Sequence, residues 1–410
     1  MIFLYTTAVR FIGFLLKIAA FFNRKISLFV LGRKDIFSVL ERKIDRNSSY
    51  VWVHTASLGE FEQGLPVIKK LRNDYKIIVT FFSPSGYEVR KNTPDADVVA
   101  YLPLDTPENA RRFVQLVQPK MAVFVKYEFW YHYLHELKKN DVPTYLLSGI
   151  FRKNQLFFKW YGGFMRDCLK SFCHFFVQDE NSAKLLASIG FTNVTVSGDT
   201  RFDRVSEILL RDNRLDFMEK FLDGNPCVVF GSSWAEDEAV FTPYINRYDG
   251  NAKFVIAPHQ TDSRHITELR SVLQKKTVLF SEMEGKNLAD YEVLVIDTVG
   301  ILTKIYSYAS IAYVGGGMGK TGLHNVLEPA VFGIPVVIGR HFEKFNEAKE
   351  LVKIGGVLSV ENENEFAETL SLLLSDNAKR IEIGKINAAF IAKNKGATEK
   401  FIASVKKDVF

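Results

Sequence analysis

The sequence has few cysteines and lacks the residue spacings of a metal site. Its three cysteines, Cys168, Cys173 and Cys227, form no C-x-x-C pair and no regular framework. This excludes a disulfide-stapled scaffold and favours a reducing, cytoplasmic setting. The eight histidines show no H-E-x-x-H or related spacing, so we expect no metal and no other cofactor. Low-complexity segments and solenoid repeats are also missing.

Acidic residues are absent before Asp35. The bases of this N-terminal stretch are Arg10, Lys17, Arg24, Lys25, Arg33 and Lys34. They account for the whole formal charge of +6, because the remaining lysines and arginines (53 − 6 = 47) equal the 47 acids. A nucleic-acid-binding body with a broad basic field is therefore disfavoured.

No long uninterrupted apolar run is present. The stretch from Phe11 to Phe22 is apolar except for Lys17, which is too short for a confident membrane-spanning helix. We interpret residues 1–34 as a segment that lies on an anionic membrane surface. An uncleaved signal sequence, or an amphipathic helix docked on the protein's own core, are the alternatives. No A-x-A cleavage site follows, which argues against secretion.

Apolar runs alternate with helical stretches from Tyr50 onward, and a chain of 410 residues can bury more than one core. The first series reads YVWVH, KIIVTFF, VVAYL, MAVFV, PTYLL, HFFVQ and TVSG, and the second CVVFG, KFVIAP, EVLVID, IAYVGGG and PVVIG. This pattern predicts an α/β protein with two doubly wound parallel sheets. Such sheets bind ligands at the carboxyl ends of their strands, so we expect the site in a cleft between the two domains.

Three parts of the chain follow from this pattern. Residues 1–34 form the membrane-associating segment, residues 35–210 an N-terminal Rossmann-like domain, and residues 211–410 a C-terminal Rossmann-like domain. The last helix is a candidate to pack back on the N-terminal domain. A polar stretch that reaches about Asn225 is the expected hinge.

The stretch from Tyr313 to Gly339 runs from a strand through a glycine-rich loop into a helix predicted at Val326 to Phe332. Gly315, Gly316 and Gly317 let the backbone approach a phosphate, and Glu328 is placed to accept hydrogen bonds from ribose hydroxyls. A tight turn with a dipole-stabilising glutamate is the structural alternative. A P-loop is disfavoured, because Val314 stands where its first glycine belongs.

Glu60 follows the first strand, and its side chain has two possible roles. Ser57 and Glu60 have the S-x-x-E spacing of a capping box, which the spacing alone favours. The alternative is a general base at the carboxyl end of a strand.

Two further strand ends carry candidates for ligand contacts. Ser232 and Ser233 are expected to cap a helix, whose N-terminus can hold a phosphate or sugar carboxylate; a plain N-cap at Ser233 is the alternative. His259, just past a strand, is a candidate phosphate donor, although a surface histidine is commoner.

An ordered series of motifs resembles the 3-deoxy-D-manno-octulosonic acid (Kdo) transferases. The motifs, from Trp52 to Asn346, are HTASLGEFEQGLPVIKKLR, TFFSPSGYE, YLPLDTPENARRFV, YEFW, SGDTRFDR, GSSWAEDE, DTVGIL and VGGGMGKTGLHNVLEPA. The resemblance implies a GT-B-type fold, a CMP-Kdo donor, inversion at the anomeric carbon and a lipid A precursor as acceptor. It further implies that residues 35–210 are the acceptor domain and residues 211–410 the nucleotide-sugar donor domain. It also implies the cytoplasmic face of the inner membrane of a Gram-negative bacterium.

The resemblance assigns roles to residues as well. It makes Glu60 the catalytic base, against the capping preference of the spacing. Ser57, Gly59 and Glu128 would lie near the reacting sugar or acceptor. The CMP portion would be held by His259, Gly316, Gly317, Asn325 and Glu328, and Ser232, Ser233, Gly315 and His324 complete the predicted substrate-binding set. The family's E-x-E-x-W motif begins here with Lys126 instead of an acid.

Two other functions are open at this point. One is a GT-B-like enzyme that uses a UDP-sugar, either a lipid-linked glycosyltransferase or a sugar-nucleotide epimerase. The other is a non-catalytic nucleotide-binding or membrane scaffold protein. The UDP-sugar enzyme is tested by asking which nucleotide raises the melting temperature of the protein. The non-catalytic protein is tested by measuring whether replacing Glu60 abolishes transfer.

Overall fold

The computed structural model describes residues 1–409, with side chains through residue 406, and divides into two compact units. The first unit comprises Met1–Arg204 and Lys395–Phe410, and the second Val205–Asn394. The chain thus leaves the first unit at Arg204, six residues before the boundary expected from the sequence (210 − 204 = 6), and returns to it at Lys395.

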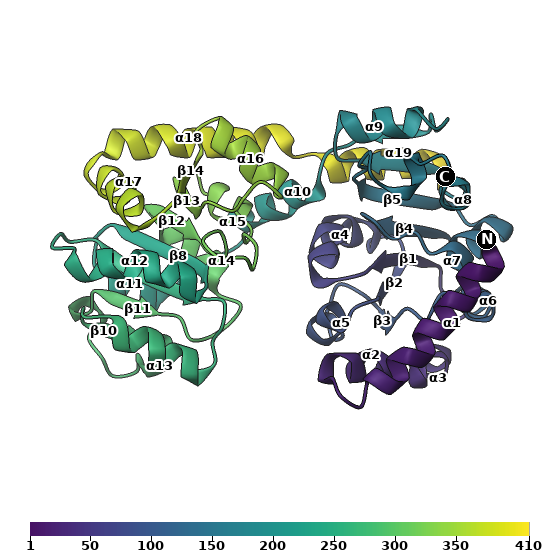
Figure 1. Cartoon of the computed structure of the whole chain (residues 1–410), viewed down its shortest axis with the longest axis horizontal. Coiled ribbons are helices and arrows are strands. Elements are labelled where there is room, and N and C mark those ends of the chain that lie inside the picture. The colour runs from purple at the N-terminus through teal and green to yellow at the C-terminus, as the bar shows by residue number, and fades with distance from the viewer. Residues whose placement is uncertain (410) are drawn as a thin grey trace. The chain divides into compact units, whose positions relative to one another are not determined.

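The first unit holds a seven-stranded parallel sheet of order β3-β2-β1-β4-β5-β6-β7 (Figure 1). Its strands are β1 (Tyr50–Thr55), β2 (Lys76–Phe81), β3 (Val98–Tyr101), β4 (Met121–Val125), β5 (Thr144–Gly149), β6 (His174–Val177) and β7 (Val194–Val196). β1 and β4 are fully buried along their length, as expected for parallel strands covered on both faces. The strand order reverses between β1 and β4, where the register pairs Val51 with Met121.

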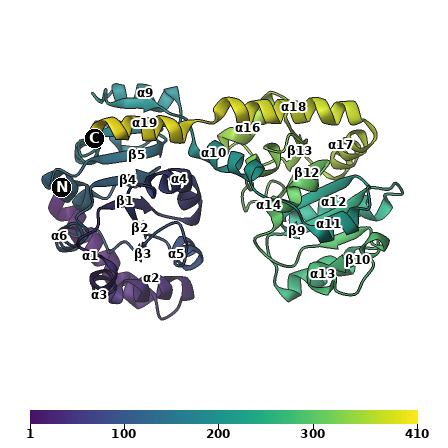
Figure 2. The ribbon, with the colours of Figure 1, turned by 180° about the vertical axis from the view of Figure 1, so that it is seen from behind.

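Helices cover both faces of this first sheet, and two apolar clusters flank it. The helices are α1 (Ile2–Ala19), α2 (Arg24–Lys34), α3 (Ile36–Lys43), α4 (Leu58–Leu71), α5 (Pro84–Arg90), α6 (Pro107–Val117), α7 (Tyr131–Lys139), η1 (Leu156–Phe158), α8 (Gly163–Leu169), α9 (Glu180–Ala187), α10 (Thr200–Ser206) and α19 (Ala397–Val409). The last of these, α19, belongs to the first unit although it ends the chain (Figure 2).

The second unit repeats the architecture with the order β10-β11-β9-β8-β12-β13-β14. Its strands are β8 (Cys227–Ser233), β9 (Lys253–Pro258), β10 (Thr277–Leu279), β11 (Val293–Val295), β12 (Ile311–Val314), β13 (Val336–Gly339) and β14 (Val357–Val360). The prediction of two doubly wound sheets is confirmed, but the sequence pattern missed the edge strands β10 and β14. The apolar runs of these two strands, TVL and VLSV, are short.

The helices of the second unit complete the fold around two further apolar clusters. They are η2 (Glu207–Leu210), α11 (Asp216–Leu222), α12 (Ala235–Arg247), α13 (Ser263–Val272), η3 (Phe280–Glu282), η4 (Leu288–Asp290), α14 (Leu302–Ile305), η5 (Tyr306–Tyr308), α15 (Leu327–Ala330), α16 (Asn346–Lys353), α17 (Glu363–Ser375) and α18 (Asn377–Asn394). The helix expected at Val326 to Phe332 is only the short α15.

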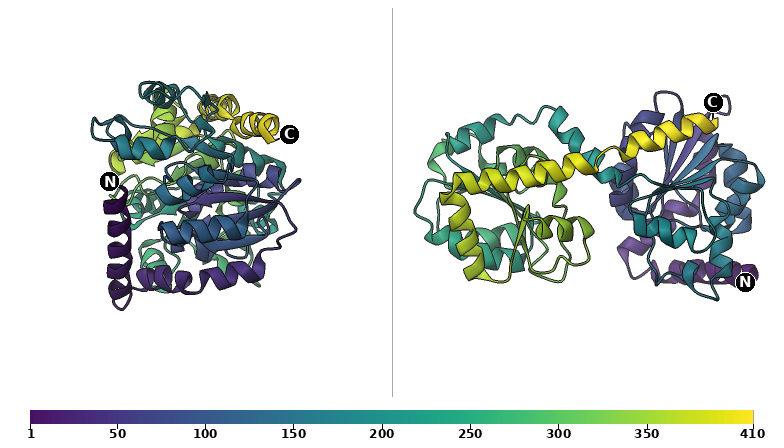
Figure 3. Two further views of the ribbon diagram at one scale, coloured as in Figure 1. Left: turned by 90° about the vertical axis from the view of Figure 1, so that its right-hand side faces the viewer. Right: turned by 90° about the horizontal axis from the view of Figure 1, so that it is seen from above.

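The N-terminal helix α1 lies along the side of the first unit (Figure 3). The Tyr5 hydroxyl donates to Asp105 at 2.6 Å, and Thr6 contacts His132 at 2.9 Å. The opposite side of α1 exposes large apolar side chains such as Phe3 (79%) and Phe11 (59%). The helix begins earlier than the run at Phe11 suggested, so by length and composition it is apolar enough to cross a membrane.

Arg33 was expected among the bases that face lipid headgroups, and this prediction is wrong. Its guanidinium donates to the carbonyl oxygens of Leu102 (2.8 Å) and Phe82 (2.7 Å), and it lies 3.6 Å from the centre of the Phe29 ring. Burial lowers the pKa of Arg33 to about 9. This side chain therefore joins α2 to the first unit. Arg10 is also engaged, in an ion pair with Glu108 at 2.6 Å.

Candidate functional site

Glu60 lies where the order of the first sheet reverses. The loop after β1 leads into α4, and Glu60 is the third residue of that helix. The loop after the neighbouring strand β4 carries Glu128. Because parallel strands end at the same edge, this reversal is the place where doubly wound sheets bind their ligands.

The Glu60 carboxylate is held by backbone rather than by a complete capping box. It accepts a hydrogen bond from the N–H of Ala56, the residue before the N-cap, whereas the N3 glutamate of a capping box accepts from the N-cap N–H. Ser57 is the N-cap residue, but its side chain makes no capping bond. The reciprocal half of the predicted box is therefore missing, and the bond that is present fixes the orientation of the carboxylate.

The pKa of Glu60 is raised to about 7. Burial is the main cause and the neighbouring charge of Glu128 the next, while the Ala56 N–H and Lys126 act in the opposite direction. A carboxylate with a pKa near neutrality is well matched to removing a proton from a hydroxyl group. Ligand access is open beside it, since a side chain at Gly59 would meet nothing within 4 Å.

Glu128 belongs to a buried polar network behind Glu60. Its carboxylate accepts from the Trp130 indole N–H at 2.7 Å and lies 3.1 Å from the imidazole Nε2 of His54. His54 contacts Thr80 through Nδ1 at 2.8 Å, and the Trp52 indole also donates to Thr80. These bonds fix the position of Glu128, and hence its charge relative to Glu60.

The second sheet has its own reversal point, between β8 and β12. The glycine-rich loop follows β12, and the chain after β8 enters α12. The Asp237 carboxylate, fully buried on α12, accepts from the amides of Gly316 (2.7 Å) and Trp234 (2.9 Å) and from the Tyr313 hydroxyl (2.8 Å). Burial raises the pKa of Asp237 while these bonds oppose it. Asp237 therefore ties the loop to α12.

The glycines of this loop are required by contacts within the protein. A Cβ at Gly315 would lie 2.3 Å from the Ser232 carbonyl oxygen, and one at Gly317 would lie 2.9 Å from the Gly339 nitrogen. Gly316 has a φ of 89°, which side chains rarely adopt. The amide of Gly316 donates to Asp237, so this N–H is not free for a ligand.

Three rings stack beside the loop. The indole of Trp234 lies 4.5 Å from the His259 ring, which lies 4.6 Å from the His324 ring. Burial lowers the pKa of both histidines, that of His324 to about 4, so both are neutral at pH 7. The Trp234 N–H donates to Nε2 of His324 at 3.1 Å. The proton of neutral His324 is therefore on Nδ1, where it can serve as a donor.

Asn325 and Glu328 lie next to this stack in sequence and contact each other. The Asn325 amide donates to the Glu328 carboxylate at 3.1 Å, and its oxygen accepts from the Leu327 amide at 3.2 Å. Both side chains are half-buried. The structure thus groups the predicted residues around the glycine-rich loop, from Gly315 to Glu328, with His259 on the adjoining strand end.

The prediction that Ser232 and Ser233 cap the following helix is wrong. Both belong to β8, and the N-cap of α12 is Trp234, whose N–H is held by Asp237. Ser233 is fully buried and donates to Glu238 at 2.9 Å. Ser232 is half-buried, with a left-handed φ of 55°.

Comparisons with known proteins agree with the motif series. Residues 33–204 match the family model of the 3-deoxy-D-manno-octulosonic-acid transferase (kdotransferase). The 3-deoxy-D-manno-octulosonic acid transferase of Aquifex aeolicus is 31% identical over 350 residues, 83% of this chain and 91% of that protein. The chain belongs to the Kdo transferase family. The enzyme of the same name from Haemophilus influenzae is 27% identical over 87% of this chain and 86% of that protein.

Solved structures of related fold extend over most of the Kdo transferase chain. The UDP-GlcNAc 2-epimerase of Neisseria meningitidis aligns with a TM-score of 0.62 at 14% identity, covering 87% of this chain and 100% of that one. MurG of Acinetobacter baumannii aligns at 0.55 with 12% identity, covering 88% and 99%. At such identities the likeness shows a shared GT-B-type fold only. The family relatives make this chain a glycosyltransferase, which sets the scaffold alternative aside.

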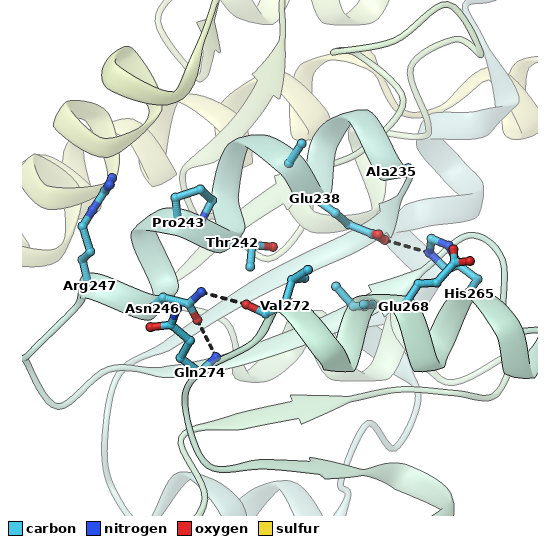
Figure 4. Close-up of a pocket in the computed structure, with 12 residues that line it drawn as sticks. Ala235, Glu238, Thr242, Pro243, Asn246, Arg247, His265, Glu268, Val272 and Gln274 are labelled. Carbon is cyan, nitrogen blue, oxygen red and sulfur yellow. Dashed lines mark hydrogen bonds and ion pairs between the residues drawn. The ribbon is translucent and has the colours of Figure 1, made fainter.

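A groove of about 590 Å³ runs between α12 and α13 of this Kdo transferase family member (Figure 4). Glu238 and His265 meet across it at 3.1 Å, and Asn246 bonds to Val272 and Gln274. The residues that line it include none of the predicted site residues. The groove is therefore separate from the glycine-rich loop.

Sequence reasoning missed His54, Trp130, Trp234 and Asp237. All four lie in the motif series. His54, Trp130 and Trp234 gave no separate signal, because burial and contacts between side chains of different elements are tertiary properties. Asp237 had a local signal, because it stands three residues after Trp234, in the N3 position from which an acid bonds back to the N-cap amide.

Proposed function

We propose that this protein transfers Kdo from CMP-Kdo to a lipid A precursor, with inversion, at the cytoplasmic face of the inner membrane of a Gram-negative bacterium. Its membership of the Kdo transferase family and the name of its relatives support the sugar. The single observation that carries the mechanism is Glu60, a half-buried carboxylate at a strand end with a pKa near 7. Membrane association is supported by the exposed apolar side of α1.

In the proposed reaction Glu60 is the general base. It takes the proton of the acceptor hydroxyl as that oxygen forms a bond to the anomeric carbon of Kdo. The bond from this carbon to the phosphate oxygen breaks, and its electrons leave with CMP. One base opposite the leaving group suffices for inversion, and no covalent nucleophile is required. Ser57, Gly59 and Glu128 are proposed to lie near the sugar or acceptor.

The second unit is proposed to hold the CMP portion. His324 can donate through Nδ1 and His259 lies against it, while Asn325 and Glu328 offer an amide and a carboxylate for ribose. Gly315, Gly316, Gly317, Ser232 and Ser233 would act mainly by shaping the loop. Neutral donors and helix ends would then offset the charge on the leaving phosphate, and the proposal includes no metal or other cofactor.

The deciding experiment incubates the protein with CMP-Kdo and a lipid A precursor and reads the products by mass spectrometry. We expect products heavier by one or more Kdo residues, in the presence of EDTA as well. Glu60→Gln keeps an oxygen for the Ala56 amide but removes the base, so its kcat should fall by about 10²–10⁴-fold. Wild-type-like transfer by this variant would remove Glu60 from the mechanism.

Glu62→Gln is the matched control. Glu62 lies on the same helix and pairs with Arg90 and Arg204 rather than with the site, so its kcat should stay within about twofold of the wild type. The donor is tested separately by thermal shift, since a ligand of the native state raises Tm. CMP or CTP should stabilise the protein, and stabilisation by UDP alone would overturn the donor assignment.

A further inference from the structure

The loop after β5 exposes three large apolar side chains at the edge of the first unit. Leu156 is 50% exposed, Trp160 91% and Tyr161 54%. We call residues 156–161 the aromatic loop. Isolated apolar side chains on a surface need no explanation, but a contiguous group of this kind marks an interaction surface.

The aromatic loop is held firmly in place. Phe157, at its centre, is buried and packs on Phe129 with ring centres 4.9 Å apart. The Arg166 guanidinium donates to the carbonyl oxygens of Phe157 and Lys159, both at 2.9 Å. These bonds leave the loop little freedom to fold Trp160 inward, so its exposure is a fixed feature of the unit.

The segment that contains the loop carries charges of one sign in its sequence. Between Phe151 and Arg166 the chain carries the bases Arg152, Lys153, Lys159 and Arg166, and the first acid is Asp167. The N-terminus shares this feature, since it has no acid before Asp35. Exposed aromatic side chains among bases fit the interface of an anionic bilayer, where Trp and Tyr are enriched and Lys and Arg meet lipid headgroups.

The aromatic loop also adjoins α1. The Tyr5 ring of α1 lies 5.5 Å from the ring of Phe164, which follows the loop at the start of α8. The residues just before Tyr5, Phe3 and Leu4, are 79% and 65% exposed. The apolar side of α1 and the aromatic loop therefore lie close together on the first unit.

We propose that the aromatic loop inserts into the headgroup region of an anionic phospholipid bilayer, as a second membrane contact beside α1. This inference rests on the membrane association proposed above. Because the loop follows β5, it belongs to the same sheet edge as the loops that carry Glu60 and Glu128. Two contacts fix an orientation where one helix would allow rotation, and they hold this edge at the membrane surface, where a lipid-borne hydroxyl arrives.

The first test reads Trp160 directly in the full-length protein. The chain has four tryptophans, and Trp52, Trp130 and Trp234 are buried or half-buried. Vesicles of phosphatidylcholine and phosphatidylglycerol with brominated acyl chains should quench wild-type fluorescence. Trp160→Phe should lose that quenching while still cosedimenting. If the wild-type protein binds the vesicles but its fluorescence is not quenched, the proposal is wrong. The fluorescence does not depend on Kdo transfer, so this result is separate from a failure of the proposed function.

The second test measures vesicle affinity. Trp160→Ser with Tyr161→Ser should weaken binding by about tenfold or more. The matched control is Leu209→Ser with Leu210→Ser, since these leucines are also exposed (52% and 88%) but belong to the second unit. Equal loss in both pairs, or none in the first, would contradict the proposal. Unchanged vesicle binding by the first pair would point instead to a protein partner for the loop.

A charge variant separates the basic contribution from the aromatic one. Lys153→Gln with Lys159→Gln should weaken binding to anionic vesicles by about fivefold per lysine. Binding to purely zwitterionic vesicles should not change. A loss of the same size on both vesicle types would contradict a role for headgroup charge.

Discussion

At the scale of single residues, the environment of Glu60 sets its chemistry. The same side chain serves as the N3 residue of a helix and as the proposed base, and the two roles are compatible because the Ala56 amide binds only one carboxylate oxygen. Lys126, which stands in place of the family's acid, lowers the pKa of Glu60, and Glu128 raises it. The departure at Lys126 therefore keeps the base closer to neutrality than a second acid would.

The pH dependence of transfer is the first prediction. Glu60 acts when deprotonated and its pKa is about 7, so kcat/KM should rise about tenfold per pH unit below 7 and level off above it. Glu128→Gln removes the neighbouring charge that raises this pKa. The rising limb should therefore move to lower pH in that variant, which a pH–rate profile measures.

Glu62→Gln serves again as the control, because Glu62 is not among the groups that shift the Glu60 pKa. Its profile should coincide with that of the wild type. If the rising limb of the pH–rate profile of Glu128→Gln stays in place or moves to higher pH, the charge of Glu128 does not raise the pKa of Glu60.

Only part of this site was predictable from the sequence. The S-x-x-E spacing located Glu60, but spacing alone favoured a cap, and the resemblance to a family was needed to favour the base. Burial is the main cause of the raised pKa and the charge of Glu128 the next. The approach of Glu128 depends on β1 pairing with β4 in register. Pairing between strands so far apart in the chain leaves no local pattern.

At the scale of elements, the glycine-rich loop is fixed by α12. The side chain of Asp237, in the first turn of α12, joins that turn to Gly316 and Tyr313. Long buried strands such as β1 and β9 were predicted because their apolar runs are continuous. The edge strands β10 and β14, with the short apolar runs TVL and VLSV, were missed.

Asp237→Ala gives the second prediction. The substitution leaves the buried Tyr313 hydroxyl and the Gly316 amide without their acceptor, at about 1–3 kcal/mol each. If the loop shapes the nucleotide site, CMP affinity measured by calorimetric titration should fall by at least about tenfold. Glu236→Gln, on the exposed neighbouring position, should bind as the wild type does. If folded Asp237→Ala binds CMP with normal affinity, the shape that Asp237 gives the loop is not required for nucleotide binding.

Arg33 gives the third prediction, at the level of α2. Arg33→Ala removes two hydrogen bonds to buried carbonyl groups of the first unit and the contact with Phe29. We expect a loss of about 2–4 kcal/mol in the free energy of unfolding, measured with urea. Lys34→Ala removes an exposed base and should change it by less than about 0.5 kcal/mol. If both substitutions change the free energy of unfolding by equally small amounts, Arg33 does not stabilise the first unit and the expectation that it faces the membrane stands again.

At the scale of the whole molecule, the chain crosses between its two units twice. After α18 it returns to the first unit, where Phe401, Ile402 and Val405 complete an apolar cluster on one face of the sheet. The Asp203 carboxylate accepts from the Thr398 amide and hydroxyl, both at 2.7 Å. The last helix was the candidate to pack back on the N-terminal domain, and α19 lies on the sheet of the first unit.

The last prediction therefore concerns truncation. A chain that ends at Asn394 loses three buried side chains from the first unit, each worth about 1.5–3 kcal/mol, and leaves the second unit's core intact. Scanning calorimetry should show a lower transition for the first unit, while CMP still raises the transition of the second. Phe401→Ala should reproduce part of the effect without shortening the chain. If truncation instead lowers the transition that CMP raises, α19 stabilises the second unit, contrary to its packing.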